Sequence, residues 1–255
     1  MQRYFIQLSY DGTNYHGWQI QPNGISVQET VEKALSVVAR ETVSVTGAGR
    51  TDAGVHASFY VAHFDVDSQD LDNEKIIHNL NCLLPADIAV QTIFKVAAEA
   101  HARFDAVSRT YKYYLIKRKD PFLRHYAEKE ARTPDLAKMN EAASKLFSYE
   151  DFTSFSRLGT DVKTNNCKVD LAQWIDEGHQ IVFTIRADRF LRNMVRAIVG
   201  TLLEVGFGKL TIKEFCQVIE AKDRCAAGAS VAAKGLFLVD IGYPKELSKE
   251  LIHSI

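Results

Sequence analysis

The chain has 255 residues, of which 46% are hydrophobic and 25% are charged, and its formal net charge at pH 7 is −1. This composition is ordinary for a globular enzyme. The near-zero charge excludes a basic surface spread over the whole molecule, so a surface for nucleic acid would have to be local. No apolar run reaches about 18 residues. The N-terminal MQRYFIQLSY lacks a basic-then-apolar segment, so we expect neither a membrane span nor export.

The first half of the chain predicts the element order β-α-β-β-α-β. Residues with high strand preference predict strands over 3–10, 42–46, 56–66 and 87–96. A capping box from Ser26 to Glu29 opens a helix whose apolar residues recur at near i, i+4 spacing: Val27, Val31, Leu35 and Val38. A shorter helix is predicted over 73–84 and ends before Pro85.

The second half predicts a similar order. Thr133 and Pro134 mark a helix start, with threonine at the cap and proline in the first turn. Another helix is predicted from about Phe190, and a capping box from Thr211 to Glu214 opens a further one. Strands are predicted over 109–118, 166–175, 179–187 and 235–243, the middle two forming a hairpin around Glu177-Gly178.

These elements together predict an α+β fold. It consists of two split β-α-β (ferredoxin-like) modules, each a mostly antiparallel sheet with helices on one face. We expect the two sheets to join into one extended sheet. The expected domains are an N-terminal module over residues 1–104 and a C-terminal module over residues 105–255.

Cysteine usage indicates the compartment. The four cysteines are widely spread, and none has zinc-binding spacing: Cys82, Cys167, Cys216 and Cys225. We therefore expect reduced thiols in a cytoplasmic protein, with no metal site.

The stretch GAGRTDAGVHA, Gly47 to Ala57, carries the most unusual local chemistry. It lacks the Lys-Ser/Thr of a Walker A loop, and Asp52 stands where a dinucleotide fingerprint needs glycine. One interpretation is a loop in which Asp52 pairs with Arg50 only to define its shape. The other is a reactive site, because the glycines permit close approach and Arg50 would keep Asp52 ionised as a nucleophile or base.

Two further groups near this stretch bear on its chemistry. His56 could take part in a proton relay, although a histidine that enters a strand is more often structural. A carboxylate-dependent hydrolase would need a second carboxylate about 5–10 Å from Asp52. Asp65 and Asp67 are the nearby candidates in the sequence, and nothing marks either as an acid.

The Gly47–Ala57 stretch resembles the signature of the tRNA pseudouridine synthase A family. Further segments resemble family segments in the expected order along nearly the whole chain: YDGTNYHGWQIQP, LPADIAV, HARFDAVSRTYKYYL, DFTSF, FLRNMVRAIVGTLLEVG and AAKGLFLVDIGYP. The predicted two-module architecture also agrees with the fold of that family.

The resemblance implies an isomerase that detaches uracil from its ribose, rotates it and reattaches it through carbon 5, with no metal, nucleotide or redox cofactor. Asp52 is its implied nucleophile and attacks either C1′ of the ribose or C6 of the base. Arg50 is implied to help hold the target nucleotide out of the RNA stack. Tyr111 is implied to stack on the uracil, Arg196 to pair with Asp52, and Leu236 to cover the base edge.

The implied substrate is tRNA, modified at uridines 38, 39 and 40 of the anticodon arm. The implied assembly is a homodimer in which the tRNA contacts both subunits. The alternative is a non-catalytic RNA-binding or tRNA-chaperone protein of the same fold. Without the resemblance, Tyr111 would be interpreted as an aromatic that packs in a sheet.

Local charge supports an RNA surface. Between His101 and Arg132, nine lysines and arginines stand against four acids, and six aromatic residues lie among them. Basic residues among aromatics suit an RNA backbone with unstacked bases. A second row of polar residues is expected on the helix from Phe190 and is either a solvated face or a positive wall near the site: Arg189, Arg192, Asn193 and Arg196. Beside it lies an apolar stripe: Leu191, Met194, Val195, Ile198 and Leu202.

One stretch departs from the family pattern. Where members commonly carry Gly-Gln after V-H-A, this chain has Ser58-Phe59-Tyr60. The departure leaves Asp52 intact but changes the contacts beside it, and it bears on the choice of target nucleotide.

Overall fold

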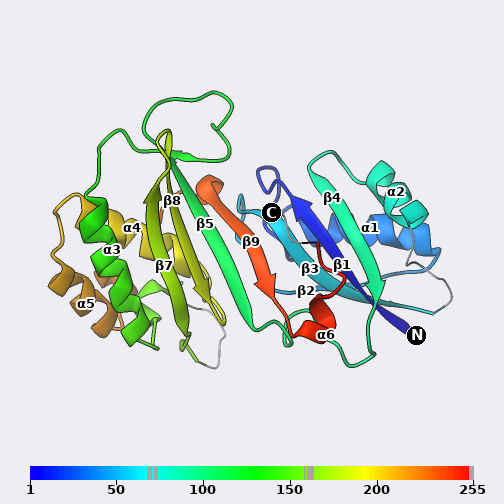
Figure 1. The fold of residues 1–255 in the computed structure, drawn as a ribbon. Helices are drawn as coiled ribbons and strands as arrows, with labels where there is room; N and C mark the ends of the chain where they lie inside the picture. Colours follow the sequence, from blue (N-terminus) through cyan, green and yellow to red (C-terminus); the bar gives the residue numbers. More distant parts are fainter. Residues whose placement is uncertain (68–70, 72–73, 158, 160–163, 253–255) are drawn as a thin grey trace. The chain divides into compact units, whose positions relative to one another are not determined.

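The structure is a computed structural model that describes residues 1–67, 71, 74–157, 159 and 164–252. Its strands form a mixed, mostly antiparallel nine-stranded sheet, and with its helices the chain has the α+β fold predicted from the sequence (Figure 1). The chain divides into two compact units, residues 1–108 with 238–255 and residues 109–237. The division into domains at residues 104 and 105 stays a prediction.

The first unit is built on three long antiparallel strands. Strand β1 (Gln2–Tyr10) lies between β3 (His56–Val66) and β4 (Ile88–Lys95), and the short β2 (Val45–Gly47) pairs with β3. Helices α1 (Val27–Ala39) and α2 (Glu74–Leu83) pack against each other on one face of this sheet (Figure 1). The order β-α-β-β-α-β predicted for the first half is confirmed.

Strands β1 and β3 of this unit are buried on both faces. Every residue from Tyr4 to Leu8 of β1 is buried, and β3 shows the same pattern. The C-terminal segment contributes to this burial, because the buried Gln7 exchanges two hydrogen bonds with the backbone of Ile252, at 2.6 and 2.8 Å. Strands that are buried on both faces form a rigid support for the loops at their ends.

The second unit contains another set of three antiparallel strands. Strand β8 (Gln180–Ala187) lies between β5 (Ser108–Ile116) and β7 (Val169–Asp176), and the two-residue β6 (Glu128–Lys129) runs parallel to β5. Helices α3 (Leu136–Lys145), α4 (Met194–Gly206) and α5 (Ile212–Glu220) pack against one another, and α3 contacts β7. The predicted hairpin turn at Glu177-Gly178 is confirmed, with Gly178 at a φ of 86°.

The remaining elements are short. They are the 3₁₀ turns η1 (Leu146–Ser148), η2 (Thr153–Phe155), η3 (Arg224–Ala226) and η4 (Ala233–Gly235), strand β9 (Leu236–Gly242) and helix α6 (Lys245–Ser248). Strand β9 begins in the second unit and continues into the first, which is why the C-terminal residues belong to the first unit. No helix within the described ranges is long and apolar enough to cross a bilayer.

Two helix starts differ from the sequence prediction. Helix α3 is capped by Asp135, whose carboxylate accepts from Lys138 N at 3.1 Å, so the cap lies two residues after Thr133. Helix α4 begins at Met194 rather than near Phe190, because Asn193 takes a left-handed conformation with a φ of 66°. The capping box of α5 is confirmed, with both of its reciprocal hydrogen bonds formed.

Candidate active site

The conspicuous GAGRTDAGVHA stretch forms the connection from β2 to β3. Arg50 is exposed, Thr51 is buried and Asp52 is half-buried. Val55 N donates to the carbonyl oxygen of Asp52 at 3.1 Å, which closes a tight turn around the carboxylate-bearing residue. The site is therefore a short loop at the end of a rigid sheet, as the flanking strands predicted.

The N-terminal segment that follows β1 is packed directly against this loop. A Cβ atom at Gly12 would collide with the carbonyl oxygen of Val55, and one at Gly17 would collide with that of Thr51. Gly17 also has a φ of 90°, which a side chain would strain. Backbone hydrogen bonds complete the contact, from Trp18 N to Thr51 O and from Gly54 N to Tyr15 O, both at 3.3 Å.

The sequence alone did not predict this contact between the N-terminal segment and the loop. The segment YDGTNYHGW contributes to the sequence prediction only through the family resemblance. Its two glycines, five residues apart in a polar stretch, were the available signal. They mark places where two backbones touch, and the partner of each becomes visible only in the folded chain.

His56 is structural in its surroundings. Its ring is 1% exposed, and Nδ1 lies 3.1 Å from Gly12 N and 3.0 Å from Asp11 Oδ1. These contacts join the start of β3 to the N-terminal segment. This agrees with the structural interpretation, and it adds another support for the loop.

Phe59 and Tyr60, two residues of the departure from the family pattern, are turned into the protein. Their exposed fractions are 3% and 0%, whereas Ser58 is exposed. Both bulky rings are therefore part of the core.

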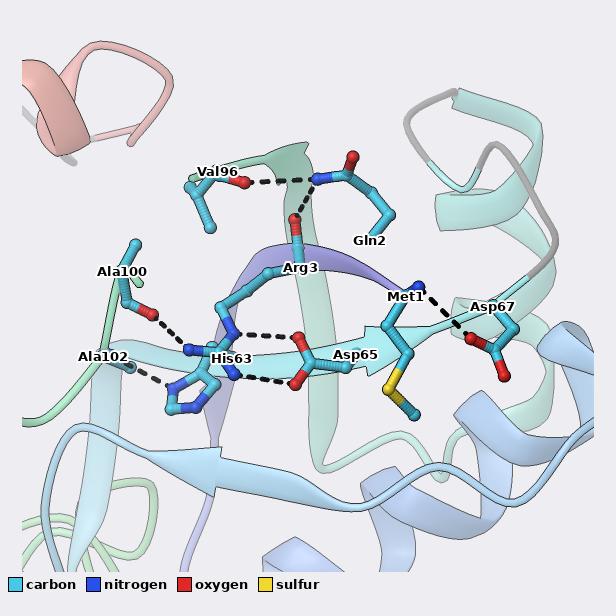
Figure 2. A network of polar contacts seen from close by, with 9 residues as sticks. All are labelled: Met1, Gln2, Arg3, His63, Asp65, Asp67, Val96, Ala100 and Ala102. Carbon is cyan, nitrogen blue, oxygen red and sulfur yellow. Dashed lines mark hydrogen bonds and ion pairs between the residues drawn. The ribbon is translucent and has the colours of Figure 1, made fainter. Parts of the chain in front are cut away.

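Asp65 and Asp67, the candidates for a second reactive carboxylate, are engaged in ion pairs (Figure 2). Arg3 donates two hydrogen bonds of 2.8 Å to Asp65, which lower the pKa of that carboxyl group. Asp67 lies 3.3 Å from the N-terminal ammonium group. Asp65 also stands nine residues along β3 from His56, about 30 Å at strand spacing. Asp52 is only four residues before His56, so Asp65 lies too far from Asp52 to be the second carboxylate of a glycoside hydrolase.

The second unit carries the other three residues implied by the resemblance. Tyr111 lies on β5, half-buried, with the ring of Phe190 edge-on at 5.2 Å between centroids. The first five residues of β5 are all half-buried, so this part of the strand is outside the core. Leu236 is the first residue of β9 and is 5% exposed.

Arg196 lies in the first turn of α4. All other residues of this helix except Glu204 are buried. The Nε of Arg196 donates to Val231 O at 2.7 Å, and its own carbonyl accepts from Val231 N at 3.2 Å. The guanidinium group is thus held at its Nε by the backbone of Val231, a contact that orients it without a substrate.

The expected row of arginines on one helical face is wrong. Arg189, Arg192 and Asn193 precede the first residue of α4, so they do not share a face with Arg196. The apolar residues of the stripe are all buried, as expected: Leu191, Met194, Val195, Ile198 and Leu202.

The basic run from His101 to Arg132 is partly neutralised within the chain. Lys117 pairs with Asp176 at 2.7 Å and Arg132 with Glu130 at 2.8 Å. Arg118 and Lys119 are exposed beside Lys117. Among the described residues, no three histidine, cysteine, aspartate or glutamate side chains are grouped as metal ligands would be.

Comparison with known proteins identifies the class of protein. The family described as tRNA pseudouridine synthase matches residues 7–105 and 142–244. A tRNA pseudouridine synthase A of Bacteroides fragilis is 59% identical over 248 residues, 97% of this chain and 98% of that one. A Parabacteroides distasonis protein of the same name is 60% identical over 247 residues, with 97% and 98% covered, and one from an Exiguobacterium species is 38% identical, with 96% and 99% covered.

The chain belongs to the tRNA pseudouridine synthase family. This confirms the resemblance carried by its motifs and the class of enzyme, an isomerase, that the resemblance implied.

Proposed function

We propose that this protein isomerises uridine to pseudouridine in the anticodon stem-loop of tRNA, with Asp52 as the nucleophile. Family membership over nearly the whole chain supports the reaction. The observation that carries the assignment to Asp52 is its place on a loop whose backbone is held by the N-terminal segment and by β3. A reactive carboxylate benefits from such a support because a small displacement of the attacking atom is costly.

In the reaction, the bond between N1 of uracil and C1′ of ribose breaks, and a bond between C5 of uracil and C1′ forms. The proton on C5 is released and N1 of uracil takes up a proton, so that product and substrate have the same atoms. Asp52 attacks either C1′ or C6 to allow this exchange, and the target base must first leave the stack, which costs a few kcal/mol.

Four further residues have proposed roles. Arg50 stabilises the flipped-out nucleotide, Tyr111 stacks on the uracil and Leu236 covers the base edge. Stacking of a base on an aromatic ring contributes about 1–3 kcal/mol. Arg196 pairs with Asp52, and the hydrogen bond from its Nε to Val231 supports a fixed orientation of the guanidinium.

The finer assignments concern substrate and assembly. The proposed targets are uridines 38, 39 and 40, the proposed compartment is the cytoplasm, and the proposed assembly is a homodimer in which the tRNA contacts both subunits. Sedimentation of the purified protein tests the dimer, because a monomer at assay concentration would contradict it.

Release of tritium from tRNA that contains 5-tritiated uridine tests the activity directly, since only loss of the C5 hydrogen frees the label. Mapping of the modified position then identifies the target uridine. Binding of tRNA without tritium release would favour the non-catalytic alternative. Release with the modification outside positions 38–40 would correct the target only.

A further inference from the structure

We propose that Tyr60 is a positioning residue for the reaction, acting through the backbone of the loop that carries Arg50 and Asp52. The inference rests on the proposed function, because it concerns the geometry of the reactive carboxylate. It also gives a role to the departure from the family pattern at residues 58–60.

The hydroxyl group of Tyr60 reaches the loop. Tyr60 lies on β3, fully buried, and donates a hydrogen bond to the carbonyl oxygen of Gly49. On the other side of Arg50, the hydroxyl of Tyr10 lies 2.9 Å from Oγ1 of Thr51. Two buried phenols therefore hold residues 49 and 51, which immediately flank Arg50 and precede Asp52.

The ring of Tyr60 is itself held in place. It stacks on Trp18, with ring centroids 4.0 Å apart and planes inclined at 29°, and it meets Tyr10 edge-on at 5.5 Å. Gly47 leaves the space for this cluster, since a Cβ atom there would collide with the hydroxyl of Tyr60 and lie 2.6 Å from an indole carbon of Trp18.

These contacts connect the ring cluster to the loop by two routes. The backbone nitrogen of Trp18 donates to Thr51 O, while its indole packs on the ring of Tyr60. The Tyr60 hydroxyl adds the link to Gly49. Removal of the hydroxyl alone would release one end of the loop and leave the ring packing in place, so that the effect should fall on catalysis and not on tRNA affinity.

The test is Tyr60→Phe, assayed by tritium release under saturating and subsaturating tRNA. We expect kcat to fall about 10- to 100-fold, the effect of a displaced reactive group, with KM for tRNA changed less than about twofold. The matched control is Tyr4→Phe. Tyr4 is also a buried phenol of the first unit: it is 1% exposed, accepts a hydrogen bond from Leu71 N at 3.4 Å and stacks on Phe64.

Tyr4→Phe should keep the wild-type kcat while it lowers the melting temperature about as much as Tyr60→Phe does. A kcat for Tyr60→Phe within about twofold of wild type, or an equal decrease in Tyr4→Phe, would overturn the proposal. Tyr60→Gln separates the two features of the side chain, because an amide keeps a donor but has no ring. A kcat in this variant above that of Tyr60→Phe assigns the effect to the hydrogen bond.

Thr51→Val provides an independent route if Tyr60→Phe does not fold. It removes the partner of the Tyr10 hydroxyl with little change of shape, and a decrease of kcat at constant KM is expected again. A wild-type kcat in this variant would overturn the proposal that hydrogen bonds from buried tyrosines position the loop on both sides of Arg50. The wild-type protein is assayed in parallel: if it releases no tritium, the proposed function fails, whereas normal wild-type release with unaffected variants rejects only this inference.

Discussion

Asp52 is the residue on which the proposed chemistry depends. Its position indicates a role in the reaction and not in the binding of tRNA. It is half-buried on a loop of few residues, while the exposed lysines and arginines of the basic run lie elsewhere in the sequence. Asp52→Asn keeps the shape of the side chain and removes its charge and nucleophilicity. We expect tritium release to fall at least about a thousandfold. Binding of tRNA, measured by filter retention, should stay near wild type.

Asp67→Asn is the matched control for this change. Asp67 is an exposed carboxylate of the same unit, and it pairs with the N-terminal ammonium group at 3.3 Å. The variant should keep full activity. Activity of Asp52→Asn within about tenfold of wild type would contradict a nucleophilic role.

His63 is a buried histidine of β3, in the network around Arg3 (Figure 2). Its Nδ1 accepts from Ala102 N at 3.1 Å. Burial, with smaller effects from His101 and Arg3, lowers the pKa of His63 to about 4. An unfolded histidine titrates near 6.5, so between about pH 4 and 6.5 the unfolded chain binds more protons than the folded one. The contribution of His63 to the free energy of unfolding is therefore complete above about pH 6.5 and is lost as the pH falls towards 4.

His63→Gln tests this linkage, since an amide oxygen can accept from Ala102 N but does not titrate. We expect the melting temperature of the wild type to fall between pH 7 and pH 5, and that of the variant to fall less. The change with pH decides the outcome, and the stability of the variant at pH 7 alone does not. Equal slopes for the two proteins would show that another group causes the acid sensitivity.

Helix α4 is held in place by a segment that is distant in the sequence, residues 229–231. Gly200, inside the helix, faces the carbonyl group of Ala229, whose carbon would lie 3.0 Å from a Cβ atom there. Further contacts join the same segment to the helix start, from Asn193 Nδ2 to Ser230 Oγ at 2.6 Å and from Arg196 Nε to Val231 O at 2.7 Å. The segment 229–231 thus runs along the first turns of α4 and holds Arg196.

Gly200→Ala has two opposite expected effects on the free energy of unfolding. Intrinsic helix propensity favours alanine by about 1 kcal/mol. The collision with Ala229 instead predicts a destabilisation of about 1–3 kcal/mol from overpacking, because the obstacle is backbone and cannot rotate away. We expect the destabilisation to dominate, seen as a lower midpoint of urea unfolding. A stabilised variant would show that segment 229–231 yields easily, and that it does not hold Arg196 firmly.

At the scale of the whole molecule, RNA binding has to arise on a chain of net charge −1. Each phosphate that a cation neutralises adds to the salt dependence of binding, so the slope of affinity against salt counts the cations used. Arg118→Glu or Lys119→Glu should weaken tRNA binding and reduce this slope by about one for each phosphate that is no longer neutralised.

Lys117→Gln is the control within the same run, because Lys117 already pairs with Asp176 at 2.7 Å. Its effect on affinity and slope should be smaller than that of either exposed neighbour. An unchanged slope in Arg118→Glu and Lys119→Glu would remove this part of the run from the RNA-binding surface.

The sequence predicted the elements whose signals are local. Strand β3 occupies residues 56–66 as expected, and the predicted capping box of α5 is formed. Both were predictable because strand preference and helix capping depend on neighbouring residues. The start of α4 was predicted wrongly because it depends on a contact that is distant in the sequence. Asn193 adopts its left-handed conformation while its side chain bonds Ser230, a residue 37 positions away.

The sequence by itself determined the order of strands and helices, the α+β class, and, through its co-linear motifs, the family and the candidate nucleophile Asp52. Only the tertiary structure decided what supports that carboxylate. Gly12 and Gly17 touch the loop from another segment, Tyr60 holds it from below, and Arg3 engages Asp65 at the far end of the same strand. Propensity and spacing act between neighbours in the chain, whereas these contacts join residues far apart in sequence, and only folding brings them within reach of one another.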